Sequence, residues 1–546
     1  MNARLKPANE RTEATSPWWQ RGTIYQVYPR SFMDSNGDGV GDLQGIVSRL
    51  DHLRWLGVDA VWISPVYPSP MKDFGYDVAD YVGIDPLFGT LADFDHLVSE
   101  AHARGLKVIL DFVPNHSSDQ HAWFRESSLA RTSPKRDWYI WRDPAPDGGP
   151  PNNWLSVFGG SAWQFDAATG QYYYHAFLRE QPDLNWRNPQ VVDAMLDVLR
   201  FWLDRGVDGF RVDVLWHLAK DEEFRDNPRN PNWHGGMDPY QELLPLRTAD
   251  LPDVHGIVTR LRNLVDEYQE RVLIGEIYLP VEKLVRYYGP DLRGAHLPFN
   301  FQLVSAKWNA RELAKMIARY EEVLPPGAWP NWVLGNHDQH RIATRIGSHQ
   351  ARVAAMLLLT LRGTPTLYYG DEIGMHDVAI PPELVQDPFE KNVPGLGLGR
   401  DPERTPMQWS AQRNAGFSDA APWLPVANDF DEVNVEAQRG DPHSVLTLYS
   451  RLIALRRAEP ALETGRFEAL ECEGDVLAYF RHPQGDESAF LVALNLGDTD
   501  HILPEHGSHG VIVLSTRLDR ESEAVHGTMR LRPSEGVIVR IQPQAQ

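Results

Sequence analysis

Eight short runs rich in apolar and β-branched residues follow one another along the first four-fifths of the chain, with helix-like segments between many of them. Strands that alternate with helices favour a parallel sheet. Eight such units close a barrel, so we predict the α/β class and a (β/α)₈ TIM barrel. The runs cover residues 23–32, 59–67, 107–116, 209–214, 271–278, 296–301, 331–338 and 365–374.

Most of these runs end in polar or charged residues. The working site of a (β/α)₈ barrel lies at the carboxyl ends of its strands, so these side chains are expected to meet at one mouth. Three carboxylates from the ends of the fourth, fifth and seventh runs, surrounded by histidines and an arginine, suit acid–base or nucleophilic chemistry. The candidates are Asp111, Asn115, His116, Arg211, Asp213, Glu276, His337 and Asp338.

The run GFRVDV carries two charges inside an apolar strand. Residues two apart on a strand share a face, so Arg211 and Asp213 point one way, and Phe210, Val212 and Val214 the other. An unpaired charge in a dry interior costs several kcal/mol, so the pair is either a structural ion pair or the lining of a wet cavity. The order of the eight runs favours a pair at the barrel mouth.

Two long segments interrupt the barrel pattern. Residues 114–187, rich in Trp, Pro, Gly and Tyr, follow the third run, and residues 376–440 follow the eighth. Long segments at a barrel mouth usually build the pocket wall. We predict a barrel from residues 1–113 and 188–463, an inserted subdomain from 114–187, and a C-terminal antiparallel β-domain from 464–546, where short alternating runs begin.

Charge and cysteine content narrow the possible partners and location. The formal net charge of −22 argues against nucleic acid or an anionic membrane surface as the main partner, because both attract clustered Lys and Arg. No apolar run is long enough to span a bilayer. The single cysteine, Cys472, cannot form an internal disulfide, and residues 1–19 lack the apolar core of a secretory signal. We therefore expect a cytoplasmic protein.

Four motifs, DFVPNH, GFRVDV, GEIY and NHD, stand in this order on the third, fourth, fifth and seventh predicted strands. QPDLN at 181 and RTPMQW at 404 accompany them. With this set, the chain resembles the α-amylase family of glycoside hydrolases, in its oligo-1,6-glucosidase and α-glucosidase branch. The resemblance covers nearly the whole chain and implies a retaining enzyme with no organic cofactor.

The resemblance implies a role for each carboxylate. Asp213 matches the family's nucleophile, Glu276 the general acid/base, and Asp338 the third carboxylate, which binds sugar hydroxyls. A retaining mechanism needs one ionised and one protonated carboxyl group. Arg211, two residues along the strand, is expected to keep Asp213 ionised. Asp111, His116 and His337 match residues that support the sugar at the cleavage point.

The same resemblance implies a pocket closed behind one glucose unit. Tyr76 matches a tyrosine that stacks on the terminal glucose, and Asp73 with Arg400 matches a pair that holds the non-reducing end. We therefore expect exo-action on short α-glucosidic oligosaccharides and disaccharides. A structural salt bridge that closes a loop is the alternative for Asp73 and Arg400. QPDLN and Val214 look like members that prefer α-1,6 bonds, and the linkage stays open.

Residues 34–42, DSNGDGVGD, have the oxygen spacing of an EF-hand loop. The twelfth position is Gly45, so the bidentate glutamate that favours calcium is missing. We expect a structural Ca²⁺ or Mg²⁺, and an Asx-rich turn without an ion is the alternative. Relatives in the family bind a metal here, and the matching ligands are Asp34, Asn36, Asp38, Val40 and Asp42.

Two other functions are open to a chain of this kind. Some family members lost their carboxylates and act as binding or transporter-associated subunits, but all three carboxylates are present here. A transglucosylase or a trehalose synthase-like isomerase uses the same covalent intermediate and passes the glucosyl group to a sugar instead of water.

Overall fold

The computed structural model describes residues 16–504 and 509–542. Its central sheet has eight strands in the order β10-β11-β1-β2-β3-β7-β8-β9, and each pairing in it is parallel. Every strand falls within one of the eight predicted runs, except that β11 begins one residue early, at Thr364, so the (β/α)₈ barrel is confirmed. The strands are β1 (Ile24–Val27), β2 (Ala60–Ile63), β3 (Lys107–Phe112), β7 (Gly209–Val212), β8 (Val272–Gly275), β9 (Leu297–Pro298), β10 (Asn331–Val333) and β11 (Thr364–Tyr368).

Helices surround this sheet, and local sequence fixes several of their ends. The Asp42 carboxylate caps the first long helix by accepting from the Gly45 N–H, and Gly57 ends it with φ of 97°. The helices are α1 (Trp18–Arg21), α2 (Pro29–Phe32), α3 (Leu43–Leu56), α4 (Leu91–Ala103), α5 (Ala122–Ser128), α6 (Pro189–Asp204), α7 (Val254–Val265), α8 (Val281–Leu284), α9 (Gln302–Ser305), α10 (Ala310–Val323), α11 (Ile342–Ile346), α12 (Ser348–Thr360), α13 (Pro388–Asn392), α14 (Val435–Arg439), α15 (Val445–Ala458) and α16 (Pro460–Glu463).

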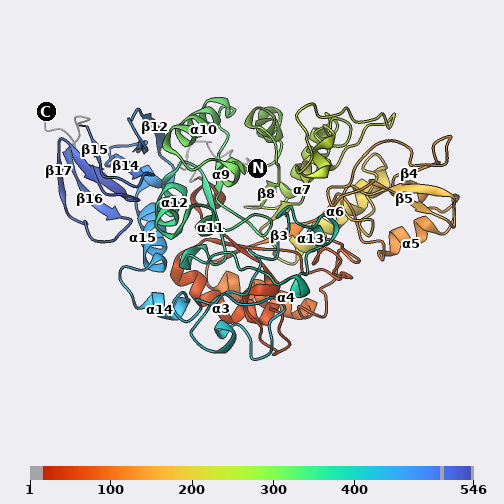
Figure 1. The fold of residues 1–546 in the computed structure, drawn as a ribbon, viewed down its shortest axis with the longest axis horizontal. Coiled ribbons are helices and arrows are strands. Elements are labelled where there is room, and N and C mark those ends of the chain that lie inside the picture. The colour runs from red at the N-terminus through yellow and green to blue at the C-terminus, as the bar shows by residue number, and fades with distance from the viewer. Residues whose placement is uncertain (1–15, 505–508, 543–546) are drawn as a thin grey trace, which may run out of the picture.

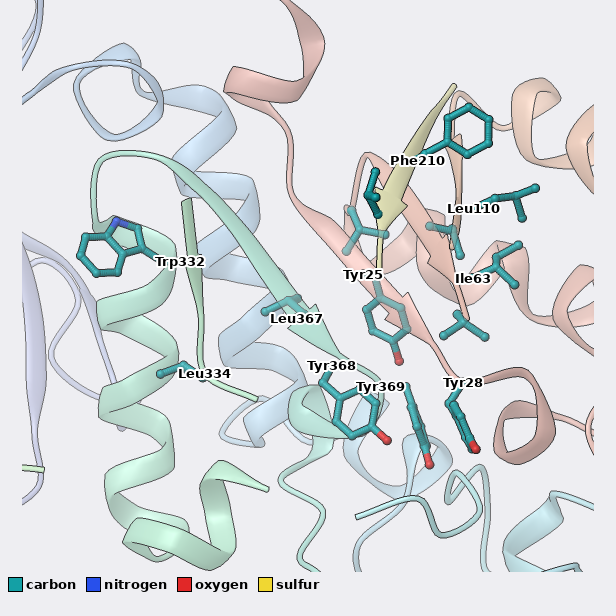
Figure 2. Close-up of a cluster of buried hydrophobic side chains, with 14 of the residues drawn as sticks. Tyr25, Tyr28, Ile63, Leu110, Phe210, Trp332, Leu334, Leu367, Tyr368 and Tyr369 are labelled. Carbon is teal, nitrogen blue, oxygen red and sulfur yellow. The ribbon is translucent and has the colours of Figure 1, made fainter. Parts of the chain in front are cut away.

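Side chains alternate between two layers along each barrel strand. In β2, Trp62 belongs to the cluster that fills the barrel, and Ile63 belongs to the larger cluster between strands and helices. Figure 2 shows Tyr25, Ile63, Leu110 and Phe210 gathered in this outer layer from four neighbouring strands. This alternation follows the two-residue period of a strand.

The same period places the charges of GFRVDV. Phe210 and Val212 pack in the outer layer, and Arg211 lies opposite Asp111 on the neighbouring strand. Arg211 therefore lies on the inner face of the barrel and bonds Asp213 there, as predicted. Val214 departs from the prediction that it shares the face of Phe210: β7 ends at Val212, and Val214 lines the cavity described below.

One seam of the barrel is closed by a side chain. Within the described ranges, β9 and β10 form no ladder with each other. The buried Asn331 amide spans this gap, accepting from the Asn300 N–H at 2.9 Å and donating to the Pro298 carbonyl at 2.5 Å. It satisfies two buried backbone groups that strand pairing would otherwise satisfy.

Two smaller sheets lie at opposite ends of the long axis of the molecule (Figure 1). The inserted sheet β4-β6-β5 falls between β3 and α6, and the C-terminal antiparallel sheet has the order β12-β13-β14-β19-β16-β17, beside a β15-β18 pair. The domain boundaries at 113, 187 and 463 stay predictions. The strands are β4 (Trp141–Arg142), β5 (Trp163–Asp166), β6 (Gln171–Tyr174), β12 (Arg466–Leu470), β13 (Val476–His482), β14 (Phe490–Asn495), β15 (His501–Leu503), β16 (His509–Ser515), β17 (Ala524–His526), β18 (Met529–Leu531) and β19 (Gly536–Ile541).

A search of the helices in residues 16–504 and 509–542 found none with the length and apolar character needed to cross a membrane. Residues 1–15, which form most of the polar stretch behind the prediction of a cytoplasmic location, lie outside the described residues.

We predict that Asn331→Ala destabilises the barrel. It leaves the Asn300 N–H and the Pro298 carbonyl buried without partners, at a cost of about 1–3 kcal/mol each. The apparent melting temperature should therefore fall by several degrees. The control Asn263→Ala changes an exposed amide on α7 and should alter stability by no more than about 0.5 kcal/mol. Equal melting temperatures for the two variants would contradict the role of Asn331 at the seam between β9 and β10.

Candidate active site

A cavity of about 860 Å³ opens where the carboxyl ends of the barrel strands meet. Asp213 follows β7, Glu276 follows β8, and His337 and Asp338 follow β10 by a few residues. Asp73, Tyr76, His116 and Arg400 also line it, together with residues from the segments 238–250 and 397–403. The structure therefore brings the predicted catalytic and sugar-binding residues around one space.

Arg211 is the centre of the charged floor. Its Nη1 donates to Asp111 Oδ1 at 2.8 Å and to Asp213 Oδ1 at 2.7 Å. Its Nη2 lies 2.7 Å from Glu276 Oε1. All four side chains are buried. One guanidinium therefore holds three carboxylates from three adjacent strands, and fixes the two candidate catalytic groups relative to each other.

Three carboxyl groups around one positive charge do not all ionise easily. Burial, opposed by Arg211, raises the pKa of Glu276 to about 7. We expected Arg211 to keep Asp213 ionised, and Arg211 does favour the charged form. Burial, with the charges of Glu276 and Asp111, outweighs it and raises the pKa of Asp213 well above its usual range. In both candidate catalytic groups, burial therefore favours the neutral form and Arg211 the charged form.

The backbone of Val214 adds a second restraint on Glu276. Val214 adopts φ of 36° and ψ of 45°, a left-handed conformation that is strained for a β-branched residue. In this conformation its N–H donates to Glu276 Oε2 at 2.7 Å. The strained residue therefore orients the carboxyl group on the neighbouring strand end.

Asp338 has the opposite electrostatics. Burial raises its pKa, but His337, Arg400 and Arg404 together outweigh burial and leave the pKa well below the usual range. Arg404 Nη2 donates to Asp338 Oδ1 at 2.7 Å, and Arg400 Nη1 donates to the same oxygen at 3.1 Å. The site thus contains an ionised carboxylate beside two carboxyl groups whose pKa values are raised.

The predicted pair of Asp73 and Arg400 forms. Arg400 Nη2 lies 2.7 Å from Asp73 Oδ1 and 2.6 Å from Asp387 Oδ1. Asp387 is fully buried and also accepts from the Arg400 backbone N–H at 2.8 Å. Arg400 therefore joins two carboxylates that lie far apart in the sequence, and Arg400 and Asp73 both line the cavity.

Tyr76 and His337 form the adjoining wall. Their rings stack with centroids 5.3 Å apart and an interplanar angle of 4°. The Tyr76 hydroxyl donates to Asp111 Oδ2 at 3.0 Å, so the ring is held from both sides. Burial lowers the pKa of His337 well below its usual range, which keeps this imidazole neutral.

The QPDLN motif connects the inserted segment to the end of β3. Gln181 Nε2 lies 3.1 Å from both Asp73 Oδ2 and His116 Nε2. Asp183 accepts from the Asn115 amide at 2.8 Å and pairs with the buried Lys220, which also donates to Asn115 Oδ1 at 2.7 Å. Burial lowers the pKa of His116 to about 4, so its ring is neutral as well.

Sequence reasoning missed three residues of this network. Arg404 begins the RTPMQW motif, and this motif was the signal that could have identified it. Asp387 and Lys220 lie in segments with no regular pattern, and only folding brings them to Arg400 and Asp183.

The predicted metal-loop residues lie apart from the cavity lining. Asp34 is buried and accepts from three backbone N–H groups and the Ser418 hydroxyl. Asn36 and Asp38 are exposed, and Asp42 caps α3. A different group of residues with metal-binding side chains consists of His340, Asp377 and Glu403, and of these His340 and Glu403 also line the cavity.

Comparison with known proteins adds independent evidence. The family model described as the α-amylase catalytic domain matches residues 26–465. The chain is 43% identical over 502 residues to a probable α-glucosidase of Rhizobium meliloti (strain 1021), covering 89% of this chain and 90% of that protein. It is 39% identical over 520 residues to an oligo-1,6-glucosidase of Heyndrickxia coagulans, covering 88% and 92%. A solved α-glucosyl transfer enzyme matches with a TM-score of 0.91 at 40% identity, covering 97% of this chain and 100% of that one.

We predict that Lys220→Met destabilises the protein strongly, because it leaves the Asp183 charge buried without its cation, at a cost of about 3–5 kcal/mol. Lys283→Met is the matched control. It breaks the ion pair of Lys283 with Asp250, in which the lysine side chain is 42% exposed. That change should cost no more than about 1 kcal/mol. Comparison of the two apparent melting temperatures tests this, and equal losses contradict the role of Lys220.

Proposed function

The chain belongs to the α-amylase family, and from that premise we propose that it is a retaining, exo-acting α-glucosidase. It hydrolyses α-glucosidic bonds at the non-reducing end of short oligosaccharides and disaccharides through a covalent glucosyl-enzyme. The observation that carries this proposal is that Asp213 and Glu276 bind different nitrogens of one guanidinium. Contact with one cation keeps the two carboxyl groups close to each other, as the attack and the proton transfer of a retaining enzyme require.

In the first step, Glu276 donates its proton to the departing oxygen while the Asp213 carboxylate attacks the anomeric carbon. The bond from that carbon to the aglycone oxygen breaks, and an ester to Asp213 forms. In the second step, water attacks the same carbon, Glu276 takes the water proton, and Asp213 leaves as a carboxylate. The productive state therefore has a proton on Glu276. Its pKa of about 7 suits the role of acid in the first step and of base in the second.

The proposed exo-action is supported by the ion pairs of Arg400 with Asp73 and Asp387, which hold its guanidinium in the cavity lining. We propose that Arg400 closes the cavity behind the first glucose. The ionised Asp338 and the neutral His116 and His337 supply acceptors and donors for the hydroxyl groups of that glucose. The linkage of the bond that is cleaved remains open.

A second candidate is transfer of the glucosyl group to a sugar, as in a transglucosylase or a trehalose synthase-like isomerase. The name of the solved relative, an α-glucosyl transfer enzyme, favours it. The names of the two sequence relatives favour hydrolysis, so hydrolysis is the main proposal.

The proposal includes a cytoplasmic location, supported by the single cysteine, Cys472, which is free in the structure. Fractionation of the producing cells tests this location.

We also propose that residues 34–42 hold a structural Ca²⁺ or Mg²⁺. Carboxylate, amide and carbonyl oxygens are the ligands that these hard cations prefer, and Asp34, Asn36, Asp38, Val40 and Asp42 offer such groups at alternate positions. Burial raises the pKa of Asp34, but hydrogen bonds from Ser418 and the loop backbone outweigh burial and leave the pKa below its usual range, so the group is an anion. The proposed ion stabilises the loop before α3 and takes no part in catalysis.

For the metal loop, we predict that a chelator lowers the apparent melting temperature and that added Ca²⁺ or Mg²⁺ restores it. Asp38→Asn should abolish this response, because it removes a charge yet keeps the oxygen that accepts from the Val40 N–H. The control Asp80→Asn changes a similar exposed turn, in which Asp80 accepts from the Val82 N–H, and should leave the response intact. A chelator without effect on the purified protein refutes the metal site.

For catalysis, we predict that the two carboxylates differ on aryl glucosides. Asp213→Asn removes the attacking group, so activity on disaccharides and nitrophenyl α-glucoside should both vanish. Glu276→Gln removes only the proton donor and later base. A nitrophenolate leaves without a proton, so this variant should release nitrophenol in a burst and then slowly, while it fails on disaccharides.

Stopped-flow absorbance measures the burst, and mass spectrometry detects the glucosyl-enzyme. In the wild type, proton NMR should show α-glucose as the first product, since two displacements retain the configuration. Loss of the burst in both variants would mean that Glu276 is not the acid/base, and β-glucose as the first product would rule out the covalent route.

A further inference from the structure

Three residues from three separate segments bring metal-binding side chains together. His340 follows β10, Asp377 follows β11, and Glu403 directly precedes the RTPMQW motif. One nitrogen or oxygen atom from each of the three lies within 4.8 Å of those of the other two. None of these residues takes part in the reaction steps proposed above, so their convergence needs an explanation of its own.

Glu403 is buried in this group with one oxygen unsatisfied. The residue is only 1% exposed, and its Oε2 has no hydrogen-bond partner among residues 16–504 and 509–542. Oε2 lies 3.8 Å from His340 Nδ1, which is too far for a hydrogen bond. Burial raises the pKa of Glu403 well above its usual range in spite of the charge of Arg404. A buried carboxyl oxygen of this kind calls for either a proton or a cation.

The other two side chains are oriented toward the same point. Asp377 Oδ1 accepts from the Arg341 N–H at 2.8 Å, and Asp377 Oδ2 lies 2.7 Å from His340 Nδ1. The Asp377 N–H donates to the Thr344 hydroxyl at 2.7 Å, so the backbone of Asp377 is held as well. The His340 side chain is 49% exposed, which leaves a path from solvent for an ion and for water.

The distances and the types of atom suit Zn²⁺. This ion binds imidazole nitrogen and carboxylate oxygen at about 2.0–2.2 Å, which places tetrahedral ligands about 3.3–3.6 Å apart. The separations of His340 Nδ1 from Asp377 Oδ2 and from Glu403 Oε2, 2.7 Å and 3.8 Å, lie on either side of that range. An imidazole beside two carboxylates favours a transition metal, because Ca²⁺ and Mg²⁺ prefer oxygen ligands alone.

We propose that His340, Asp377 and Glu403 form a binding site for a divalent transition-metal cation, with Zn²⁺ as the best match. Water completes the coordination on the exposed side of His340. The site is distinct from the loop 34–42, which offers only oxygen ligands. The inference does not depend on the proposed glucosidase activity. A proton on Glu403 with no ion is the alternative.

The proposed ion joins segments that also hold the ionised carboxylate of the active site. The first segment carries Asp338, and the third carries Arg400 and Arg404, which both donate to Asp338. The second and third segments already lie side by side, because the Val378 N–H donates to the Pro402 carbonyl at 3.0 Å. An ion at this junction therefore stabilises the wall of the cavity around Asp338.

The test measures Zn²⁺ binding to the full-length protein by isothermal titration calorimetry, after a chelator has been added and removed. Mg²⁺ is present in excess throughout, so that it fills the loop 34–42. We expect one equivalent of Zn²⁺ to bind per chain and to raise the apparent melting temperature, because an ion that binds the folded chain stabilises it. Co²⁺ in place of Zn²⁺ should gain visible absorption, since its bands intensify in a four- or five-coordinate site.

His340→Gln and Glu403→Gln should each weaken Zn²⁺ binding at least about tenfold, because each removes one of three ligands. If the buried Glu403→Gln fails to fold, the half-exposed His340→Gln decides the test. His349→Gln is the matched control. His349 is an exposed histidine on α12, and its change should leave Zn²⁺ binding as in the wild type.

Three results overturn the inference. A lack of saturable Zn²⁺ binding means that a proton, and no ion, satisfies Glu403. Binding that is unchanged by the substitutions of His340 and Glu403, or weakened equally by His349→Gln, means that the ion lies elsewhere. Zn²⁺ binding that appears only when Mg²⁺ is left out means that Zn²⁺ occupies the loop 34–42 instead.

Discussion

The site depends on one buried guanidinium. Arg211 binds Asp111, Asp213 and Glu276, and without a positive charge at this point three carboxyl groups could not share a dry space. Burial favours the neutral form of Asp213 and Glu276, and Arg211 favours the charged form. This opposition suits the proposed chemistry, because a retaining enzyme needs one carboxylate and one carboxylic acid side by side.

The barrel makes this arrangement possible through geometry alone. The two-residue period of a strand puts Arg211 and Asp111 on the inner face, and parallel pairing sets them opposite each other. Glu276 reaches the same guanidinium because it ends the next strand, β8. Closure of the barrel is then required for the site, and the buried Asn331 amide supplies it where strand pairing is missing.

The sequence predicted the parts of the molecule that depend on periodicity and order. The eight strands, the shared face of Arg211 and Asp213, and the pair of Asp73 and Arg400 all appear in the structure. What could not be predicted depends on long-range folding or on backbone conformation. Asp387 and Lys220 acquire partners only in three dimensions, and Val214 faces the cavity because the chain turns left-handed after β7. The raised pKa of Asp213 was not predicted, because a nearby arginine is visible in the sequence, whereas burial and two further carboxylates are not.

The cavity lining has two structural origins. The groups at the strand ends are held by buried ion pairs, so a change of one charge there leaves another unpaired. The segment 238–250 contributes leucine and proline side chains together with Asp238, Tyr240, Gln241 and Asp250. Connecting segments tolerate substitution better than the elements that they join, so this part of the lining could change without rebuilding the Arg211 cluster.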